Sequence, residues 1–402
     1  MAEPEQTIVL ASRFRLDALI DGRGMGDLFL GTDLVKARPV AVHILAERWT
    51  THGPSVARFL EDVARISAIG HPALVRAIGV GRMRSGRCYR VMPWLGAGHL
   101  ASVLETKGRL APDAVAALLV PVAHALDALH AFGRVHRALT PAKIHLIPVE
   151  PWVQLGGWGL GPLIAPEGDD DGRPTGVTTG PMMLDYVAPE FDRGAASDHR
   201  VDVYSLAAIV FRAISGRAPF PDATGLVRAL VDRQTQPAPS LSAALRAPVP
   251  QRLDEVVRRG LAPDPAERYG SASAFIRDLW LTANGLDADD DTSLDEVPDD
   301  ATREAVMASL PERDSHDPFE RDTSEVLEAL PSDRIESVAV STIIPVAGDG
   351  ETTEEVWIES APTPREPHAP RRDPTQVGLG EELNAVIREQ LERISSIPPD
   401  SR

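Results

Sequence analysis

The chain has 402 residues and a formal net charge of −18, and this charge is distributed unevenly. Residues 1–285 carry 29 acidic and 31 basic side chains, whereas residues 286–402 carry 30 acidic and 10 basic ones. The first part has no marked basic excess and the second is acidic, so the composition argues against a nucleic-acid partner. A single cysteine, Cys88, excludes an internal disulfide and fits a reducing compartment.

The N-terminus and the apolar runs indicate a protein that is neither exported nor membrane-spanning. The first residues, MAEPEQTIVLASRF, lack the positive start and the sustained apolar core of a signal peptide. No later stretch supplies 18 uninterrupted apolar residues. We therefore expect a cytoplasmic location and no membrane span.

Residues 13–95 contain short apolar runs that are typical of a mainly antiparallel sheet. One helix is expected before the last of these runs, because Phe59, Val63 and Ile66 recur at helical spacing after Ser55, a suitable N-cap. The expected strands cover residues 13–20, 27–34, 39–45 and 88–95.

The apolar spacing becomes helical after residue 100. In residues 111–133, Val115, Leu118 and Val122 follow the helical rule. Residues 201–214 are apolar on nearly every side, which predicts a helix buried inside a lobe. The expected fold class is therefore α+β, with a small antiparallel β lobe that includes one helix and a larger helical lobe.

The acidic second part is expected to be a disordered tail, because it is rich in proline and poor in large apolar residues. Within it, residues 381–397 space apolar side chains along one helical face, as in a short docking helix. Thr292, Thr352 and Thr353 lie in acidic settings and are candidate phosphosites for a phosphothreonine-binding domain. The predicted organisation is an N-terminal extension, a folded domain and a tail, covering residues 1–11, 12–285 and 286–402.

Six motifs in residues 12–282 resemble, in order and spacing, those of the eukaryotic-type serine/threonine protein kinases of bacteria. The resemblance implies a bilobal protein-kinase-like fold, and the family's activity is ATP-dependent phosphoryl transfer to proteins. The motifs are HPALVRAIGVG, VHRALTPAKIHL, VQLGGWGL, YVAPE, DHRVDVYSLAAIVFRAISGRAPF and LAPDPAERYGSASAF.

The resemblance implies that the phosphate-holding parts of the family are altered here. In the glycine-rich loop, Asp21 and Arg23 stand at two glycine places, and Gly26 remains at the third. The family's phosphate-binding lysine corresponds to His43, and its glutamate partner on the helix corresponds to Asp62 or Glu61. A histidine is mostly neutral at pH 7, so this place loses its fixed positive charge.

The resemblance also implies that the base and the metal ligands are replaced. Ala138 stands at the place of the catalytic aspartate, and Thr140 at that of a nearby lysine. Lys143 and Gly157 stand at the places of the two metal ligands. Alanine cannot accept a proton, glycine has no side-chain oxygen, and lysine repels a metal cation.

Positions that hold the family's fold together are retained. In the family the residues matching Glu190 and Arg268 form a buried ion pair, and the residue matching Asp202 braces the catalytic-loop backbone. The residue matching Arg137 can bind a phosphate on the activation segment, where Thr175, Thr178 and Thr179 are the candidates here. The retained positions are His136, Arg137, Gly159, Glu190, Asp202 and Arg268.

Three functions follow from these features. The leading hypothesis is an inactive pseudokinase that acts as a scaffold or regulator and binds proteins, such as an active kinase. Its alternative is a decaying kinase that has no function. The second is an atypical active kinase in which the acidic residues 168–172 supply metal oxygens. The third is a non-catalytic sensor that holds ATP without magnesium, and no other cofactor is expected. Its candidate binding residues are Arg23, Gly24, Gly26, Met92 and Lys143.

Overall fold

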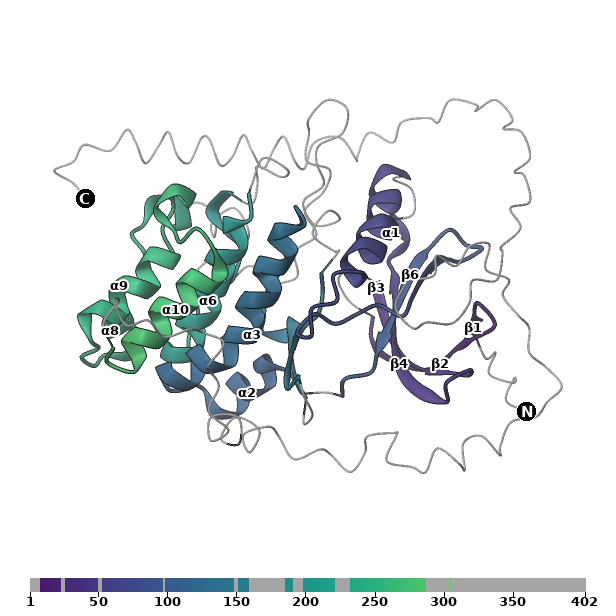
Figure 1. Ribbon diagram of the computed structural model, residues 1–402, viewed down its shortest axis with the longest axis horizontal. Helices are drawn as coiled ribbons and strands as arrows, with labels where there is room; N and C mark the ends of the chain where they lie inside the picture. The colour runs from purple at the N-terminus through teal and green to yellow at the C-terminus, as the bar shows by residue number, and fades with distance from the viewer. Residues whose placement is uncertain are drawn as a thin grey trace.

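The computed structural model divides the protein into a small β-rich lobe and a larger helical lobe (Figure 1). The predicted α+β architecture is confirmed. The tail that was predicted to be disordered lies outside the described residues, apart from Leu286 and Glu304. The structure describes residues 8–22, 26–49, 53–96, 98–147, 151–158, 185–190, 198–220, 232–286 and 304.

The small lobe is built on a six-stranded antiparallel sheet with the strand order β1-β2-β3-β4-β6-β5. Helix α1 (Gly53–Ser67) packs on this sheet through Phe59 and Val63, which are fully buried. A 3-10 turn, η1 (Glu47–Trp49), links β4 to α1. The strands are β1 (Val9–Leu10), β2 (Phe14–Asp21), β3 (Gly26–Asp33), β4 (Arg38–Leu45), β5 (Gly79–Arg82) and β6 (Cys88–Pro93).

The pairing of β3 with β4 explains why residue 26, in the predicted phosphate loop, is a glycine. Gly26 pairs with Leu45 and has a φ of 146°. A Cβ atom at this position would lie 2.1 Å from the Ile44 carbonyl oxygen, so only glycine allows this close approach of the two backbones. The backbone geometry therefore requires glycine at residue 26, independent of any phosphate.

The predicted strands of the small lobe are confirmed to within two residues at each end, and three details differ. Strand β1 lies inside residues 1–11, which were assigned to an extension, so the sheet begins at Val9. Strand β5 was missed, since it has only four residues. Helix α1 begins at Gly53, so Ser55 lies in its first turn and is not the N-cap.

The large lobe is mainly helical, and the helices predicted within residues 111–133 and at residues 201–214 are confirmed. Asp127 of α3 accepts hydrogen bonds from the Ala272 and Ser273 amides, which fastens the start of α10 to α3. The helices are α2 (Leu100–Lys107), α3 (Pro112–Ala131), α6 (Arg200–Ser215), α8 (Leu241–Leu245), α9 (Gln251–Gly260) and α10 (Ala272–Ala283). The shorter elements are η2 (Pro141–Lys143), β7 (Ile144–Leu146), β8 (Val153–Leu155) and η4 (Pro265–Glu267).

Helix α3 is long and apolar enough to cross a membrane by length and composition alone. Its most apolar 18-residue window is 61% buried inside the molecule. Val115, Leu118, Val122 and Leu126 all lie in the core of the large lobe. We therefore interpret α3 as the core helix of this lobe.

The two lobes are joined by backbone hydrogen bonds as well as by packing. The Val75 amide donates to the Leu155 carbonyl at 3.0 Å, and the Leu155 amide donates to the Ala73 carbonyl at 2.7 Å. Residue 155 ends β8 of the large lobe, while residues 73 and 75 follow α1 of the small lobe. One hydrophobic core also contains side chains of both lobes.

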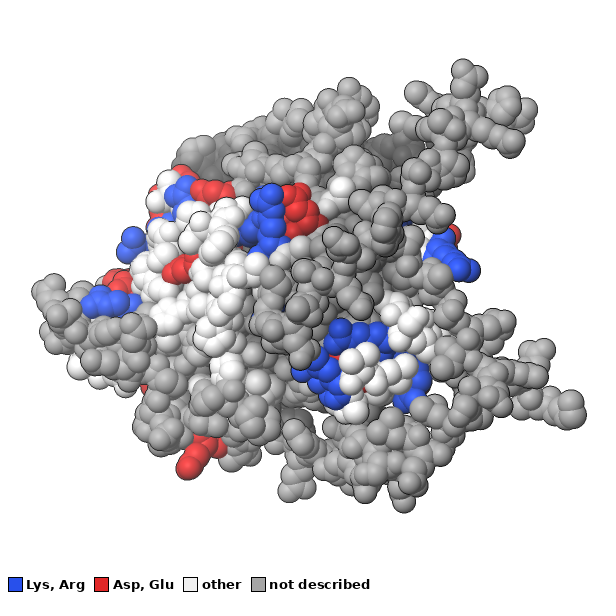
Figure 2. Space-filling model, turned by 45° about the vertical axis from the view of Figure 1, so that its right-hand side comes forward, with Lys and Arg blue, Asp and Glu red and all other residues white. Residues whose placement is uncertain are grey.

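The described surface shows no continuous basic face in the view of Figure 2, where Lys and Arg side chains stand in several separate groups. Some of the arginines in the described part of the chain are paired with carboxylates. Arg13 binds the buried carboxylate of Asp33 through two hydrogen bonds of 2.9 and 2.8 Å. This distribution fits the nearly balanced charge of residues 1–285.

Candidate active site

The loop that follows α3 is held by the carboxylate of Asp202, on α6. The His136 and Arg137 amides each donate to Asp202 at 2.8 Å, and Asp202 is fully buried. The His136 ring donates from Nε2 to the Gly156 carbonyl at 2.9 Å. Arg137 has a φ of 58°, a left-handed conformation that costs a non-glycine residue about 1–2 kcal/mol. The two hydrogen bonds to Asp202 offset this strain and fix the loop.

His130, near the end of α3, completes the surroundings of Asp202. Its Nε2 donates to Asp202 at 2.8 Å, and its Nδ1 lies 3.8 Å from Asp127. Burial alone would lower the pKa of His130, but the neighbouring carboxylates of Asp127 and Asp202 raise it to about 9. His130 is thus an imidazolium at neutral pH. The resemblance does not point to His130, although Asp127 and His130 stand three residues apart on a helix, the spacing of a side-chain pair.

The protonation of His130 predicts that stability declines at alkaline pH. Its pKa is about 9 in the folded chain and about 6.5 when unfolded. Its contribution to the free energy of unfolding is therefore complete below pH 6.5 and disappears as pH rises through 9. This contribution is at most about 3 kcal/mol. Urea unfolding at pH 6 and pH 9.5 should show the loss for the natural chain and a smaller one for His130→Gln. A difference between the two proteins that does not change with pH would contradict this prediction.

Ala138, at the predicted place of the catalytic base, is buried. The small cavity beside it contains no carboxylate among its lining residues. Thr140, two positions further on, is also buried and precedes η2. The cavity is lined by Arg137, Ala138, Leu139, Tyr186, Val187, Ala188, Val201 and Ser205.

Lys143 and Gly157, at the two predicted metal-ligand places, lie against each other. Gly157 has a φ of 78°, and a Cβ atom there would lie only 2.6 Å from the Lys143 Cδ atom. The lysine stem thus occupies the space of a side chain at residue 157. Burial and then the Arg90 guanidinium lower the pKa of Lys143 to about 8, so its head is still mainly cationic at pH 7.

These residues do not fit a magnesium ion. Magnesium requires oxygen ligands, whereas Gly157 offers no side-chain atom and Lys143 brings a positive charge. In the part of the chain that the structure describes, no three His, Cys, Asp or Glu side chains gather as metal ligands. The acidic residues 168–172 lie outside that part.

The contact between Lys143 and Gly157 predicts an energetic coupling. Gly157→Ala should lower the free energy of unfolding by about 1–3 kcal/mol, because φ is positive and the new methyl group meets the lysine stem. In a Lys143→Ala background the methyl group has room, so the loss should be smaller by at least about 0.5 kcal/mol. Denaturant unfolding of the four proteins measures this difference. Strictly additive losses would show that the two positions do not interact.

His43, on β4, cannot replace the charge of the family's lysine. It is buried, and burial together with the charges of Arg90 and Lys143 holds its pKa well below the ordinary value. Its Nδ1 has no hydrogen-bond partner within the described regions. Asp62 of α1, the predicted partner, instead lies 3.2 Å from the Arg134 Nε atom. At the two positions of the family's lysine–glutamate pair, this chain therefore has a neutral histidine, His43, and an aspartate, Asp62, that contacts Arg134 instead.

Arg90, which sequence analysis did not single out, is the cation that lies beside His43. The two residues are directly opposite in the β4–β6 pairing, so their side chains emerge on the same face of the sheet. Arg90 is 3% exposed, and its Nη1 donates to the Trp158 carbonyl at 2.5 Å. The indole of Trp158 donates to the Val75 carbonyl at 2.8 Å. The sequence signal was an arginine within the otherwise apolar run of β6.

Glu190 and Arg268 form a buried bidentate pair, as the resemblance implies. The Arg268 guanidinium donates to the two Glu190 oxygens at 2.6 and 2.8 Å, and both side chains are at most 4% exposed. It also donates to the carbonyls of Arg200, Ala262 and Pro263. Five hydrogen bonds thus bind the YVAPE segment to the start of α6 and the segment before η4.

Comparison with known sequences assigns this arrangement to a family. The model of the protein kinase domain matches residues 21–281. The chain belongs to the protein kinase domain family. The serine/threonine-protein kinase PknL of Mycobacterium tuberculosis is 32% identical over 285 residues, covering 71% of this chain and 69% of PknL. The probable serine/threonine-protein kinase CE0033 of Corynebacterium efficiens is 29% identical, covering 68% of this chain and 42% of that protein.

Solved protein kinase structures share the fold. A crystal structure of the M. tuberculosis PknI kinase domain superposes with a TM-score of 0.52 at 24% identity, covering 71% of this chain and 100% of that chain.

Of the remaining predicted residues, one lies in the described part of the chain and the others lie outside it. Met92, on β6, is partly buried against the main core and pairs with Ala41. Outside the described residues lie Arg23, Gly24, Gly159, Thr175, Thr178, Thr179, Thr292, Thr352, Thr353 and residues 381–397.

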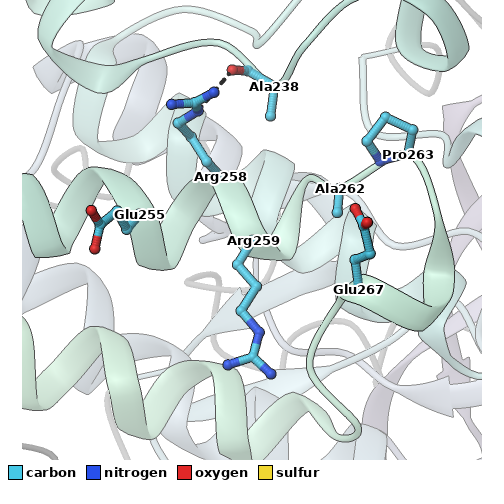
Figure 3. Close-up of a pocket in the computed structure, with 7 residues that line it drawn as sticks. All are labelled: Ala238, Glu255, Arg258, Arg259, Ala262, Pro263 and Glu267. Atoms are coloured by element: carbon cyan, nitrogen blue, oxygen red, sulfur yellow. Dashed lines mark hydrogen bonds between the residues drawn. The ribbon is translucent and has the colours of Figure 1, made fainter.

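A second hollow lies on the large lobe, beside α9 and η4 (Figure 3). Arg258 donates to the Ala238 carbonyl at 3.1 Å, whereas Arg259 points the other way and lies 4.2 Å from the Tyr269 ring centroid. Glu255 and Glu267 also line the hollow. Two arginines and two glutamates give it no net charge, so it does not select an ion of either sign.

Proposed function

We propose that this protein kinase homologue is catalytically inactive and works by binding other proteins. The observation that carries the proposal is the contact of Lys143 with Gly157 at the metal place, beside Ala138 at the place of the base. A positioned base contributes roughly 10²- to 10⁴-fold to a rate. Metal stabilisation contributes several kcal/mol, and each ~1.4 kcal/mol is tenfold. Loss of both leaves no useful turnover.

The intact frame of the domain supports a scaffolding role. The Glu190–Arg268 pair and the Asp202 brace are contacts that keep the large lobe folded whether or not phosphate is transferred. A folded domain without turnover can still present a constant surface to a partner such as an active kinase. In the same proposal, the cytoplasm is its location, and the threonines of residues 286–402 provide contacts for a phosphothreonine-binding domain.

Phosphoryl transfer is the direct test of inactivity. The full chain, incubated with magnesium, γ-labelled ATP and general acceptor proteins, should incorporate no label into itself or into them, while an active kinase does so in parallel. Incorporation that falls when Lys143 or Arg90 is substituted would overturn the proposal. Incorporation that disappears when Asp169, Asp170 and Asp171 are changed to asparagine would identify an atypical active kinase instead.

The protein-binding half of the proposal has its own test. Pull-downs with the full chain and with a chain that ends at Leu286 should both recover partner proteins, and the full chain should recover an additional set. If a phosphothreonine-binding domain recognises phosphorylated threonines of residues 286–402, pretreatment of the full chain with an active kinase should enlarge that additional set. Recovery of no specific partner by either chain would contradict a scaffolding role.

A further inference from the structure

One edge of the small-lobe sheet is only partly covered by the strands that the structure describes. Strand β1 pairs with the start of β2, and this pairing extends to the bond from the Leu16 amide to the Ile8 carbonyl, at 2.9 Å. Strand β3 continues along the inner side of β2, but neither β1 nor another described strand lies on the outer side of residues 17–20. Such an edge presents backbone donors and acceptors to any strand that fits it.

This edge ends an apolar row that crosses β2, β3, β4 and β6. The row consists of residues directly opposite one another, namely Leu19, Phe29, Val42 and Val91. Opposite residues on neighbouring strands have their side chains on the same face of the sheet. Val42 and Val91 are fully buried and Phe29 packs against their cluster, but Leu19 is 58% exposed. A strand with one apolar face, added beside β2, would continue the row and cover Leu19.

The acidic tail contains a segment with this pattern, the sequence SVAVSTII of residues 337–344, which lies outside the described residues. Every second residue is β-branched and suits one face of a strand: Val338, Val340, Thr342 and Ile344. Three small residues stand between them, namely Ser337, Ala339 and Ser341. Pro345 ends the run, because proline has no amide to donate to a strand ladder.

The tail is long enough to reach β2 and has the charge to approach it. Fifty residues separate Leu286 from the segment. A flexible linker of that length has an end-to-end distance of about 40 Å, about twice the radius of gyration, roughly 19 Å, of a domain of this size. Residues 8–96, which contain the small-lobe sheet, carry 13 basic and 7 acidic side chains, whereas residues 286–402 carry 10 and 30. These opposite net charges favour the encounter.

Residues 4–7 are the nearer candidate for the same edge. If β1 continued in its observed register, they would lie opposite residues 17–20. Their sequence, PEQT, includes a proline, and it contains no valine, leucine or isoleucine that could cover Leu19. The tail segment therefore fits the edge better, both in its backbone donors and in its apolar face.

We propose that residues 337–344 add a strand to the outer edge of β2, with their β-branched face on the side of Leu19. The open end of β2 is then an interaction surface, and its partner is the acidic tail of the same chain. This inference does not depend on whether the domain transfers phosphate. Another protein that used this edge would first have to displace the tail.

Hydrogen exchange of the full chain, followed by mass spectrometry, tests the pairing. The outward-facing amides of residues 17–20 should exchange about tenfold more slowly in the natural chain than in Val340→Asp, which puts a charge on the covered face. This factor corresponds to an intrinsic Kd of about 0.1 mM when the linker sets an effective concentration on the order of 1 mM. A peptide of residues 335–346, added in excess to Val340→Asp, should restore the slow exchange.

The matched control is Ser341→Asp, which adds the same charge one residue away on the opposite face and should keep the slow exchange. The amides of α6 should exchange equally slowly in all three proteins, which shows that each is folded. Equal exchange of residues 17–20 in the natural chain and Val340→Asp would overturn the proposal, as would an equal loss in Ser341→Asp.

Two further results would assign the edge to another occupant and so also overturn the proposal. Protection of residues 17–20 that rises with protein concentration would indicate a second copy of the chain. Protection that survives Val340→Asp but disappears on removal of residues 1–7 would indicate the N-terminal segment.

Discussion

Replacement of Arg268 by methionine should lower the free energy of unfolding by about 3–5 kcal/mol. The change leaves the Glu190 carboxylate buried without its bidentate partner, and it removes donors from three backbone carbonyls. Urea unfolding followed by circular dichroism measures the loss. The double variant Glu190→Leu with Arg268→Met should lose less than the sum of the single changes, because no isolated charge remains.

The control for this prediction is Arg65→Met, on the exposed face of α1. Arg65 pairs with Glu61 one turn away, and their side chains are 66% and 51% exposed, so its loss should stay within about 0.5 kcal/mol. A loss below about 1 kcal/mol for Arg268→Met would mean that water or another group compensates Glu190.

Asp202→Asn should lower the free energy of unfolding by about 2–4 kcal/mol. An asparagine can accept from only one of the His136 and Arg137 amides and turns its own donors toward the other, and it removes the charge that faces His130. The pKa of His130 should fall from about 9 toward its ordinary value. Urea unfolding measures the first effect, and a pH titration of the His130 ring by NMR measures the second.

Asp198→Asn provides the comparison for Asp202. Asp198 is 43% exposed and binds Arg200 two residues away, so its change should cost no more than about 1 kcal/mol. An unchanged His130 titration in the Asp202→Asn protein would show that Asp127 alone holds the proton.

The longer elements of the fold could be predicted from the sequence because their apolar residues repeat with the period of the structure. The helix α3 and the strands β2, β3 and β4 are examples. Strand β1 has two residues and follows no readable alternation, so it appears only when β2 pairs with it.

The site could be located from the sequence only through its resemblance to a family. That resemblance identified Ala138, Lys143 and Gly157, but no pattern indicated that the stem of Lys143 covers a residue 14 positions away. From the sequence alone, the side chain of Arg90 in β6 could equally have faced solvent. Arg90 is buried because the Trp158 carbonyl lies within its reach, a contact between residues 68 positions apart.

The bonds between residues 73–75 and residues 155–158 determine how the protein can meet a partner. Opening the two lobes would break the Ala73, Val75 and Trp158 hydrogen bonds, since each joins one lobe to the other. A surface that spans both lobes is therefore assembled before any encounter. When a partner binds both lobes, this protein loses little conformational entropy on association, so the affinity should depend mainly on the shape and charge complementarity of the two surfaces.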